Sequence, residues 1–228
     1  MNIIDIKNLY KTYNDSEVKV HAVNGVDLSF EKGEFAAIVG PSGSGKTTLL
    51  NMLGGLDQPT EGSILIDGTD LSQLKSSQLI DFRMRNIGFV FQAYNLIPVL
   101  TAKENVEFIM HLQNRPKAER ESRTMELLKA VGLEGRENSR PNKLSGGQQQ
   151  RVAVARALAS KPKFVLADEP TANLDSKSTE NLLDIMEELN RKENVTFIFS
   201  THDQRVMNKA HRVITLEDGK IISDVRKN

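Results

Sequence analysis

Four short apolar runs recur along the chain and predict buried strands. They are residues 35–39, 87–91, 164–167 and 195–199, in which Val, Ile and Phe predominate. Runs of this length without regular polar alternation are typical of parallel strands that are covered on both faces. Segments with apolar residues at helical spacing lie between the runs, so strand and helix alternate along the chain. We therefore predict an α/β fold with a parallel sheet at its centre.

Residues 1–34 have a different pattern, which predicts short strands joined by tight turns. Val26, Leu28 and Phe30 alternate with polar residues, and Asn24-Gly25 and Asn14-Asp15-Ser16 are typical turn sequences. We expect this segment to form an antiparallel sheet beside the parallel core. A further strand is predicted at 63–66, and a C-terminal hairpin at 213–225 is predicted to turn at Asp218-Gly219.

Helical patterns fill most of the remaining chain. Helices are predicted over 72–86 and, with a clear amphipathic pattern, over 177–192. Residues 93–160 are mostly helical in pattern: Thr101 and Glu104 are spaced as a capping box, and Met125 is among the apolar residues on one side of a later helix. We predict a single domain over residues 1–228, with a helical subdomain at about 93–160 within it.

The composition narrows the class of protein. The 228 residues carry 30 basic and 30 acidic side chains, and a net charge of zero gives no support to nucleic acid as a partner. The chain has no cysteine, which excludes disulfides and thiolate metal sites. No apolar run approaches the length of a membrane span, and the first residues lack the pattern of a signal peptide. These features alone predict a cytosolic soluble protein.

The first apolar run leads into a glycine-rich loop and then a helix, which is the context of a phosphate-binding P-loop. Glycines let the backbone bring its N–H groups close to a polyphosphate, and the helix N-terminus adds partial positive charge. Lys46 supplies a full charge near the β- and γ-phosphates, and the Thr47 hydroxyl can bind Mg²⁺. A flexible glycine loop is the alternative, but the flanking strand and helix favour a nucleoside triphosphate site. The predicted nucleotide-binding residues in this loop are Gly40, Pro41, Ser42, Gly43, Ser44, Gly45, Lys46, Thr47 and Thr48.

Two adjacent acids, Asp168 and Glu169, follow the apolar run at 164–167. Ligands of open α/β sheets gather at the carboxyl ends of strands, and an apolar strand that leads to Asp completes the Mg²⁺ site of P-loop proteins. Neighbouring strand residues point to opposite sides, so one carboxylate can serve the metal and the other a water molecule. A solvated turn is the less favoured alternative. Gln92 and His202 stand just beyond two other apolar runs, and we expect them at the same end of the sheet.

A second helix start suited to an anion lies far along the chain, at Leu144-Ser145-Gly146-Gly147-Gln148. Ser145 is placed to cap this helix, and the two glycines expose its first N–H groups. A capping residue followed by Gly-Gly more often simply begins a helix than forms a ligand site. The residues alone therefore leave the role of this segment open.

Taken together, these stretches resemble the ATP-binding cassette (ABC) ATPases over essentially the whole chain. GPSGSGKT at 40–47 is similar to the family's Walker A motif, KFVLADE at 163–169 to Walker B, and LSGGQ at 144–148 to the family signature. Gln92 falls at the Q-loop, Asp175 in the D-loop and His202 at the switch-histidine position. The resemblance implies a RecA-like P-loop core with an N-terminal antiparallel subdomain and an inserted helical subdomain, and ATP and Mg²⁺ as ligands. Tyr13 falls where the family places its adenine-stacking aromatic, although spacing alone leaves plain packing open.

The resemblance also implies a mechanism in which two copies meet head to tail. ATP then lies between the P-loop of one copy and the signature of the other, a twofold arrangement that closes on itself. Glu169 is expected to be the general base, with His202 and Gln92 as further catalytic residues. Mg²⁺ is expected at Thr47, Gln92 and Asp168, and Asp175 is expected to link the two sites. The signature residues expected to act on the facing copy's ATP are Leu144, Ser145, Gly146, Gly147 and Gln148.

Finer detail resembles one branch of the family. MLGGLDQPTEG, IGFVFQAYNLIPVLTAKENV and LSGGQQQRVAVARAL are similar to the ATPase subunits of the lipoprotein-releasing (LolD-like) and macrolide-efflux (MacB-like) group, with the cell-division ATPase FtsE a close relative. LSGGQQQR is closer to the efflux members, and PTANLD to the lipoprotein and division members. The resemblance implies an ATPase at the cytoplasmic face of the inner membrane that drives a separate integral membrane permease of FtsX/MacB type, for lipoprotein release or efflux.

Three other functions have to be weighed against this one. An FtsE-like regulator of a cell-wall hydrolase, acting through a membrane partner, uses the same chemistry and stays open. A non-transport soluble ABC ATPase of DNA repair or translation usually carries a coiled-coil insertion, zinc motifs or a tandem cassette, and this sequence shows none of these. A small-molecule P-loop kinase accounts for the glycine loop but not for LSGGQ, Gln92 and His202 together.

Overall fold

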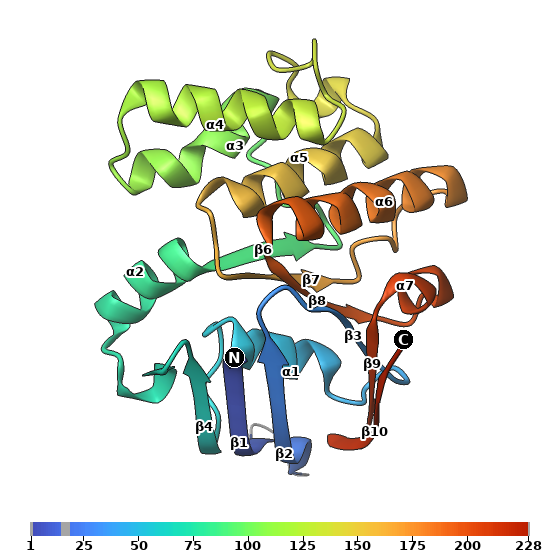
Figure 1. The fold of residues 1–228 in the computed structure, drawn as a ribbon. Helices are drawn as coiled ribbons and strands as arrows, with labels where there is room; N and C mark the ends of the chain where they lie inside the picture. The colour runs from blue at the N-terminus through green and yellow to red at the C-terminus, as the bar shows by residue number, and fades with distance from the viewer. Residues whose placement is uncertain (1, 15–18, 228) are drawn as a thin grey trace.

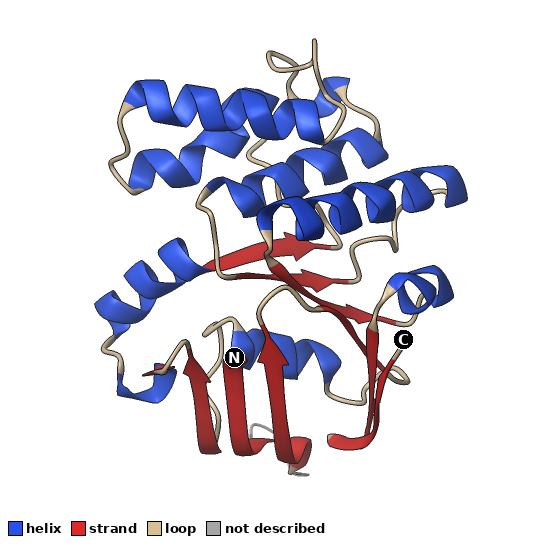
Figure 2. Ribbon diagram, in the orientation of Figure 1, coloured by secondary structure: helices blue, strands red, loops and turns tan. Residues whose placement is uncertain are grey.

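The computed structural model describes residues 2–14 and 19–227, so Asp15 and Ser16 of the predicted polar turn lie outside the described residues. Their strands form two sheets, and helices cover both faces of the larger one (Figure 1, Figure 2). The larger sheet has the strand order β10-β9-β3-β8-β7-β6. Its strands are β3 (Phe35–Val39), β6 (Ile87–Phe91), β7 (Phe164–Asp168), β8 (Thr196–Thr201), β9 (Arg212–Glu217) and β10 (Lys220–Arg226). All neighbours pair in parallel except β10, which is antiparallel to β9, so the predicted parallel core is present.

Helices lie in layers on the two sides of this sheet (Figure 1). On one side lies α1 (Lys46–Leu53), and on the other lie α5 (Gly146–Ala159) and α6 (Ser176–Glu193), with α3 (Ala102–Leu112) and α4 (Lys117–Ala130) packed beyond α5. α2 (Ser76–Asn86) leads into β6, and α7 (Gln204–Lys209) follows β8. Two 3₁₀ turns, η1 (Leu71–Gln73) and η2 (Pro141–Lys143), precede α2 and α5.

The alternation of side chains along the buried strands divides the core into two clusters. In β3, Phe35, Ala37 and Val39 pack with the helices α3 to α6, whereas Ala36 and Ile38 pack with α1 and the smaller sheet. Strand β8 repeats the pattern, with its phenylalanines in the first cluster and Ile198 in the second. Burial on both faces explains why these strands appear in the sequence as continuous apolar runs.

The smaller sheet is antiparallel and contains a correction to the predicted turns. Its strands are β1 (Asn2–Tyr13), β2 (Val20–Glu31), β4 (Glu61–Ile66) and β5 (Thr69–Asp70), in the order β2-β1-β4-β5. The predicted turn at Asn24-Gly25 is wrong, because β2 is one continuous strand. Asn24 pairs with Tyr10 and Val26 with Leu9, which leaves Gly25, at φ +71°, as the extra residue of a β-bulge. A bulge increases the twist of the strand but does not reverse it.

The helical segment 93–160 contains α3, α4, η2 and α5. The capping box at Thr101 is confirmed: the backbone N–H of Glu104 donates to Thr101 Oγ1 at 3.2 Å, and the N–H of Thr101 donates to Glu104 Oε2 at 2.7 Å. The placement of Met125 on the buried side of α4 is wrong, since 42% of its surface is exposed. The buried stripe of α4 consists of Arg123, Thr124, Leu127 and Leu128, two pairs four residues apart, and Met125 falls outside it.

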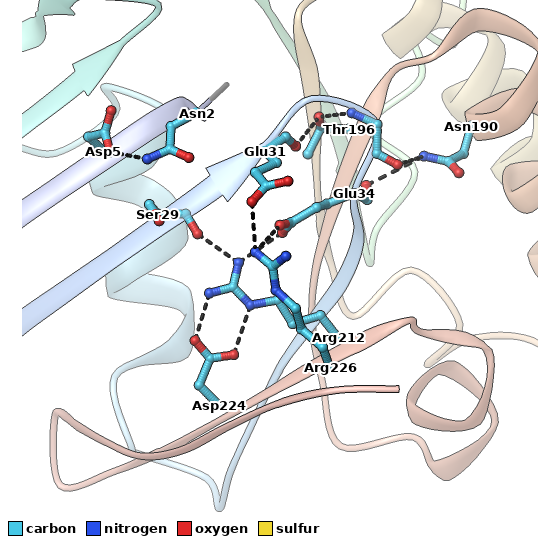
Figure 3. A network of polar contacts seen from close by, with 11 residues as sticks. Asn2, Asp5, Ser29, Glu31, Glu34, Asn190, Thr196, Arg212, Asp224 and Arg226 are labelled. Atoms are coloured by element: carbon cyan, nitrogen blue, oxygen red, sulfur yellow. Dashed lines mark hydrogen bonds and ion pairs between the residues drawn. The ribbon is translucent and has the colours of Figure 1, made fainter. Parts of the chain in front are cut away.

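A network around Arg212 ties the C-terminal hairpin to the smaller sheet (Figure 3). The guanidinium of Arg212 donates to both carboxylate oxygens of Asp224, at 2.8 and 2.6 Å, to Glu34 Oε2 at 2.9 Å and to the carbonyl of Ser29 at 2.7 Å. It also lies 5.3 Å from the centre of the Phe30 ring. The side chain is 7% exposed, so this cation is paired inside the protein and joins β9, β10, β2 and the turn before β3.

Across the described ranges, no helix combines the length and the apolar character that a membrane crossing needs.

Candidate nucleotide-binding site

The carboxyl ends of β3, β6, β7 and β8 meet at one cavity of about 900 Å³. Each of these strands ends at a predicted site residue or one residue before it. The carboxyl ends of parallel strands lie at the same edge of a sheet, so these site residues come together there. The cavity is lined by the predicted residues Tyr13, Gly40, Pro41, Ser42, Gly43, Gly45, Lys46, Thr47, Thr48, Gln92, Glu169 and His202. Residues from five separate parts of the sequence therefore share one surface.

The loop between β3 and α1 has a conformation that depends on glycine. Gly45 caps α1 with φ +100°, and a Cβ atom there would lie 2.0 Å from the carbonyl oxygen of Ala22. Gly43, at φ +81°, has open space around the position of a Cβ. The first N–H groups of α1 have no earlier helical turn to receive them, so this loop and helix start can bind an anion.

Lys46 is held inside this loop and is only 9% exposed. Its ammonium group donates to the carbonyl oxygens of Gly40 at 2.9 Å and Pro41 at 2.8 Å. Ser44, the predicted loop residue that does not line the cavity, is buried, and its hydroxyl has no hydrogen-bond partner within the part of the chain that the structure describes. The one full positive charge of the loop thus lies at its centre.

Thr47 and Asp168 supply the oxygen atoms for a cation. The hydroxyl of Thr47 lies 3.3 Å from Asp168 Oδ1, and Gln92 lines the same cavity from the end of β6. Hydroxyl, amide and carboxylate oxygens are the ligands that Mg²⁺ takes, usually together with substrate phosphates. The residues present therefore fit the predicted magnesium ion.

Glu169, the neighbour of Asp168, contacts the residues at the end of β8. Its Oε1 lies 2.7 Å from His202 Nδ1, and its Oε2 accepts a hydrogen bond of 3.2 Å from Thr201 Oγ1. The two acids do point to different partners, as predicted, but the reason differs from strand alternation. β7 ends at Asp168, and Glu169 follows at φ +45°, in the left-handed region. This backbone geometry is uncommon for Glu and turns its side chain toward β8.

The LSGGQ segment forms the predicted capped helix start. The N–H of Gln148 donates to Ser145 Oγ at 3.3 Å, and the N–H of Ser145 donates to Gln148 Oε1 at 2.9 Å. Leu144 is 7% exposed and packs in the core. Among the described residues that line the P-loop cavity, none comes from 144–148. The second anion-ready helix start is thus apart from the first.

Asp175 begins α6 rather than lining the cavity. Its carboxylate accepts hydrogen bonds from the backbone N–H of Ser178 at 2.9 Å and from the Ser178 hydroxyl at 2.8 Å. These bonds lower the pKa of Asp175 below its usual value, the backbone bond having the larger effect. The carboxylate is therefore an anion at neutral pH, and it lies on the exposed surface.

Sequence reasoning missed three kinds of residue at this site. Thr201 bonds to Glu169 across 32 positions of sequence. His21 and Asp218 line the cavity from the smaller sheet and from the C-terminal hairpin. No local pattern marks His21 or Asp218 as a site residue, since their place depends on how the two sheets pack. The short motif Ser200-Thr201-His202 at the end of an apolar run was the one available signal for Thr201.

A P-loop at the carboxyl edge of a parallel sheet, with an Asp-Glu pair and a histidine on the neighbouring strands, defines the class of P-loop nucleoside triphosphatases. Residues 23–172 match the family described as ABC transporter, and the chain belongs to this family as an ATP-binding cassette ATPase.

Similar proteins cover the whole chain. It is 47% identical over 228 residues to the macrolide export ATP-binding/permease protein MacB of Mannheimia succiniciproducens, covering 100% of this chain and 35% of that protein. It is also 47% identical over 225 residues to the ABC transporter ATP-binding protein MJ1508 of Methanocaldococcus jannaschii, covering 99% of this chain and 100% of that protein. The chain thus spans about a third of the MacB relative and the full length of the other.

A solved structure has the same fold. The ATP-binding cassette MJ0796, in a dimeric post-hydrolysis state bound to ADP and Pi, matches with a TM-score of 0.90 and 44% identity over 99% of both chains. The predicted fold class and the predicted ATPase family are therefore confirmed.

Proposed function

We propose that this chain is the ATP-hydrolysing subunit of a LolD/MacB-type transporter complex, in which two copies close around ATP and move a separate membrane subunit. One observation carries the proposal. The P-loop, Glu169 and His202 share one cavity, whereas the capped LSGGQ helix start lies outside it. A helix start with exposed N–H groups suits a phosphate, and a second copy can bring its own to this cavity.

The chemistry proposed for the cavity is attack of water on the γ-phosphorus. The loop N–H groups and Lys46 bind the β- and γ-phosphates, and Glu169 orients the water and takes its proton. The new P–O bond forms as the bond between the γ-phosphorus and the bridging oxygen breaks, which leaves ADP and phosphate. His202 holds the Glu169 carboxylate at 2.7 Å in the structure and is proposed to contact the γ-phosphate. Mg²⁺, held by Thr47, Gln92 and Asp168, would neutralise charge on the phosphate oxygens.

The residues outside the cavity are proposed to act on the facing copy. Ser145 and Gly147, with Leu144, Gly146 and Gln148 shaping the turn, meet the γ-phosphate of that copy's ATP. Asp175 lies exposed at the start of α6 and links the two reaction centres. The relative MJ0796, solved as a dimer in two structures, supports this arrangement.

Glu169→Gln tests the hydrolytic assignment. The amide keeps the size of the side chain but cannot take a proton, so turnover should fall by about 10²- to 10⁴-fold while ATP still binds. Phosphate release and equilibrium ATP binding are measured on the same preparation. Normal turnover in Glu169→Gln would remove Glu169 from this role.

A groove beside the loop 93–100 is the proposed contact for the membrane subunit. It has a volume of about 310 Å³ and is lined largely by apolar side chains of β6 and α3, among them Phe89, Phe91 and Leu112. Phe108, also in its wall, is 41% exposed, and Val99 in the loop is 70% exposed. Arg156 fixes the loop from α5 by donating to the carbonyl of Tyr94 at 2.9 Å. An apolar groove with a fixed rim suits a short amphipathic helix of a partner.

The partner is proposed to be an integral membrane permease of FtsX/MacB type, which places the ATPase at the cytoplasmic face of the cell membrane. The names of the MacB relatives, macrolide export ATP-binding/permease proteins, support an export role for that complex. Phe108→Glu should release the chain from its membrane partner and uncouple transport while basal ATP hydrolysis continues. Met125→Glu, at an exposed apolar position of α4 outside the groove, is the matched control. Full coupling in Phe108→Glu would contradict this contact.

A further inference from the structure

Tyr13 is held by two side chains that do not themselves line the nucleotide cavity. The Tyr13 hydroxyl donates to Asp57 Oδ2 at 2.7 Å. The ammonium group of Lys11 lies 4.8 Å from the centre of the Tyr13 ring and donates to Asp57 Oδ1 at 2.6 Å. Tyr13 lines the P-loop cavity, whereas Asp57 lines a separate cavity of about 250 Å³ beside it. The contacts with Asp57 and Lys11 therefore fix the ring without occupying the space beside the P-loop.

The loop that carries Asp57 is joined to the P-loop by a single helix. α1 begins at Lys46 and ends at Leu53, and the N–H groups of Leu56 and Asp57 then donate to the carbonyl of Asn51 at 2.8 and 3.3 Å. The end of β1 is bound to the same loop, because the N–H of Thr60 donates to the carbonyl of Tyr10 at 2.8 Å. The helix α1 thus begins with Lys46 at the phosphate end of the cavity and leads into the loop in which Asp57 bonds to Tyr13.

The charges of this cluster favour a fixed geometry. The side chains of Lys11 and Asp57 are 14% and 27% exposed. Burial raises the pKa of Asp57, but hydrogen bonds from Lys11, Tyr13 and the backbone of Gln58 outweigh it, so the pKa lies below its usual value. Asp57 is therefore an anion at neutral pH and accepts both the ammonium and the phenol hydrogen bonds. Lys11 also donates to the carbonyl of Gln58 at 2.8 Å, which anchors it from the other side.

We propose that Asp57 and Lys11 are positioning residues that hold the Tyr13 ring in place for stacking on the base of the bound nucleotide. This inference rests on the proposed nucleotide site and on the expectation, from the family resemblance, that Tyr13, which lines that cavity, stacks on adenine. A ring that is fixed before binding loses less freedom when the base arrives, which strengthens binding without touching the phosphates. The contribution therefore belongs to the base end of the ligand only.

The test compares ligands with and without a base. In Asp57→Ala, the affinity for Mg²⁺–ATP should fall about three- to tenfold, while the affinity for Mg²⁺–tripolyphosphate and the value of kcat stay at the wild-type level. Tyr13→Phe, which removes only the hydroxyl, should show the same loss, and the double variant should lose no more than either alone. Glu121→Ala, which breaks the 2.9 Å ion pair with Lys103 far from the cavity, is the control and should bind both ligands as the wild type does.

Three outcomes would overturn the inference. Equal weakening of ATP and tripolyphosphate binding would mean that Asp57 only stabilises the fold. Additive losses in the double variant would mean that Asp57 does not act through Tyr13. Normal ATP affinity in Asp57→Ala, together with reduced affinity in Tyr13→Ala, would overturn the positioning role and leave the nucleotide site unaffected. If Tyr13→Ala also bound ATP normally, Tyr13 would have no part in the proposed nucleotide site.

Discussion

Lys46 shows how a single residue combines a structural and a ligand-binding role. Its ammonium group is bound by two carbonyl oxygens of its own loop, at 2.9 and 2.8 Å, and is almost completely buried. Those carbonyl groups keep the charge at the centre of the loop, where phosphate oxygens of a nucleotide would compete for it. A charge-assisted hydrogen bond contributes more than a neutral one.

Lys46→Ala should therefore weaken ATP binding by about 10- to 100-fold, the equivalent of one charge-assisted hydrogen bond. Isothermal titration with Mg²⁺–ATP measures the change. Lys129→Ala, at an exposed position of α4, serves as a control for the loss of one positive charge. Unchanged affinity in Lys46→Ala would contradict the P-loop role of this lysine.

Asp203 is an acidic residue whose ionised form is bound by its neighbours, so its titration should affect stability. It caps α7, and hydrogen bonds from Arg205, which outweigh the opposing effect of burial, lower its pKa to about 2. Thr171 adds a further bond of 2.9 Å. Because the folded protein binds this proton more weakly than the unfolded chain does, the stabilisation is fully present above about pH 4 and is lost as the pH falls toward 2.

Asp203→Asn should remove this contribution, which is about 1 kcal/mol once solvent screening is allowed for. The difference in unfolding free energy between wild type and Asp203→Asn should therefore be constant from pH 7 to pH 5 and shrink as the pH falls below 4. Urea unfolding at a series of pH values measures it. A difference that stays constant down to pH 3 would show that the ionised Asp203 does not stabilise the fold.

At the scale of elements, local patterns predicted the strands better than they predicted what joins them. The apolar runs at 35–39 and 87–91 coincide with β3 and β6, because burial on both faces leaves a signal that needs no partner. Asn24-Gly25 was misread because a glycine with positive φ serves a bulge as well as a turn. The P-loop was also predictable, because its residues are contiguous in the sequence. The hydrogen bonds of Thr201 and Asp57 were not, because they depend on packing between distant segments.

The Arg212 network is the clearest case of a feature without a sequence signal. Arg212 bonds to the carbonyl of Ser29, 183 positions away, and Figure 3 shows Asp224 and Glu34 at its guanidinium, with Glu34 shared by the neighbouring Arg226. The hydrogen bonds that Arg212 donates to Asp224 and then to Glu34 raise the pKa of Arg212 against the effect of burial, so the group stays charged. Removing it takes away both guanidinium hydrogen bonds of Asp224 and leaves Glu34 with Arg226 as its ion-pair partner.

Arg212→Met should lower the free energy of unfolding by about 3 kcal/mol, since it keeps the volume of the side chain but removes the two guanidinium hydrogen bonds of Asp224 and one of the two arginine partners of Glu34. Arg226→Met, at a neighbouring arginine that is 58% exposed, should cost less than about 1 kcal/mol. Denaturant unfolding of both variants gives the comparison. Equal effects would mean that burial of the Arg212 charge is not what stabilises the hairpin.

At the scale of the whole molecule, the two helix starts predicted to bind an anion, those of α1 and α5, lie apart, and among the described residues Glu169 and His202 line the cavity of the first. The antiparallel sheet and the C-terminal hairpin supply cavity walls from one side, through Tyr13, His21 and Asp218. The signature helix start belongs instead to α5, in the helical layer that also contains α3 and α4, and lies above α6 in Figure 1. Two copies related by a twofold axis would complete two reaction centres at once, because each supplies what the other lacks.

Sedimentation velocity of Glu169→Gln with Mg²⁺ and ATP tests this arrangement most directly. The account predicts a stable dimer that forms only with ATP, reverts to monomer with ADP, and is abolished when Ser145→Arg is added to the same chain. A Glu169→Gln protein that binds ATP yet sediments as a monomer, both alone and beside its membrane partner, would contradict the shared reaction centre.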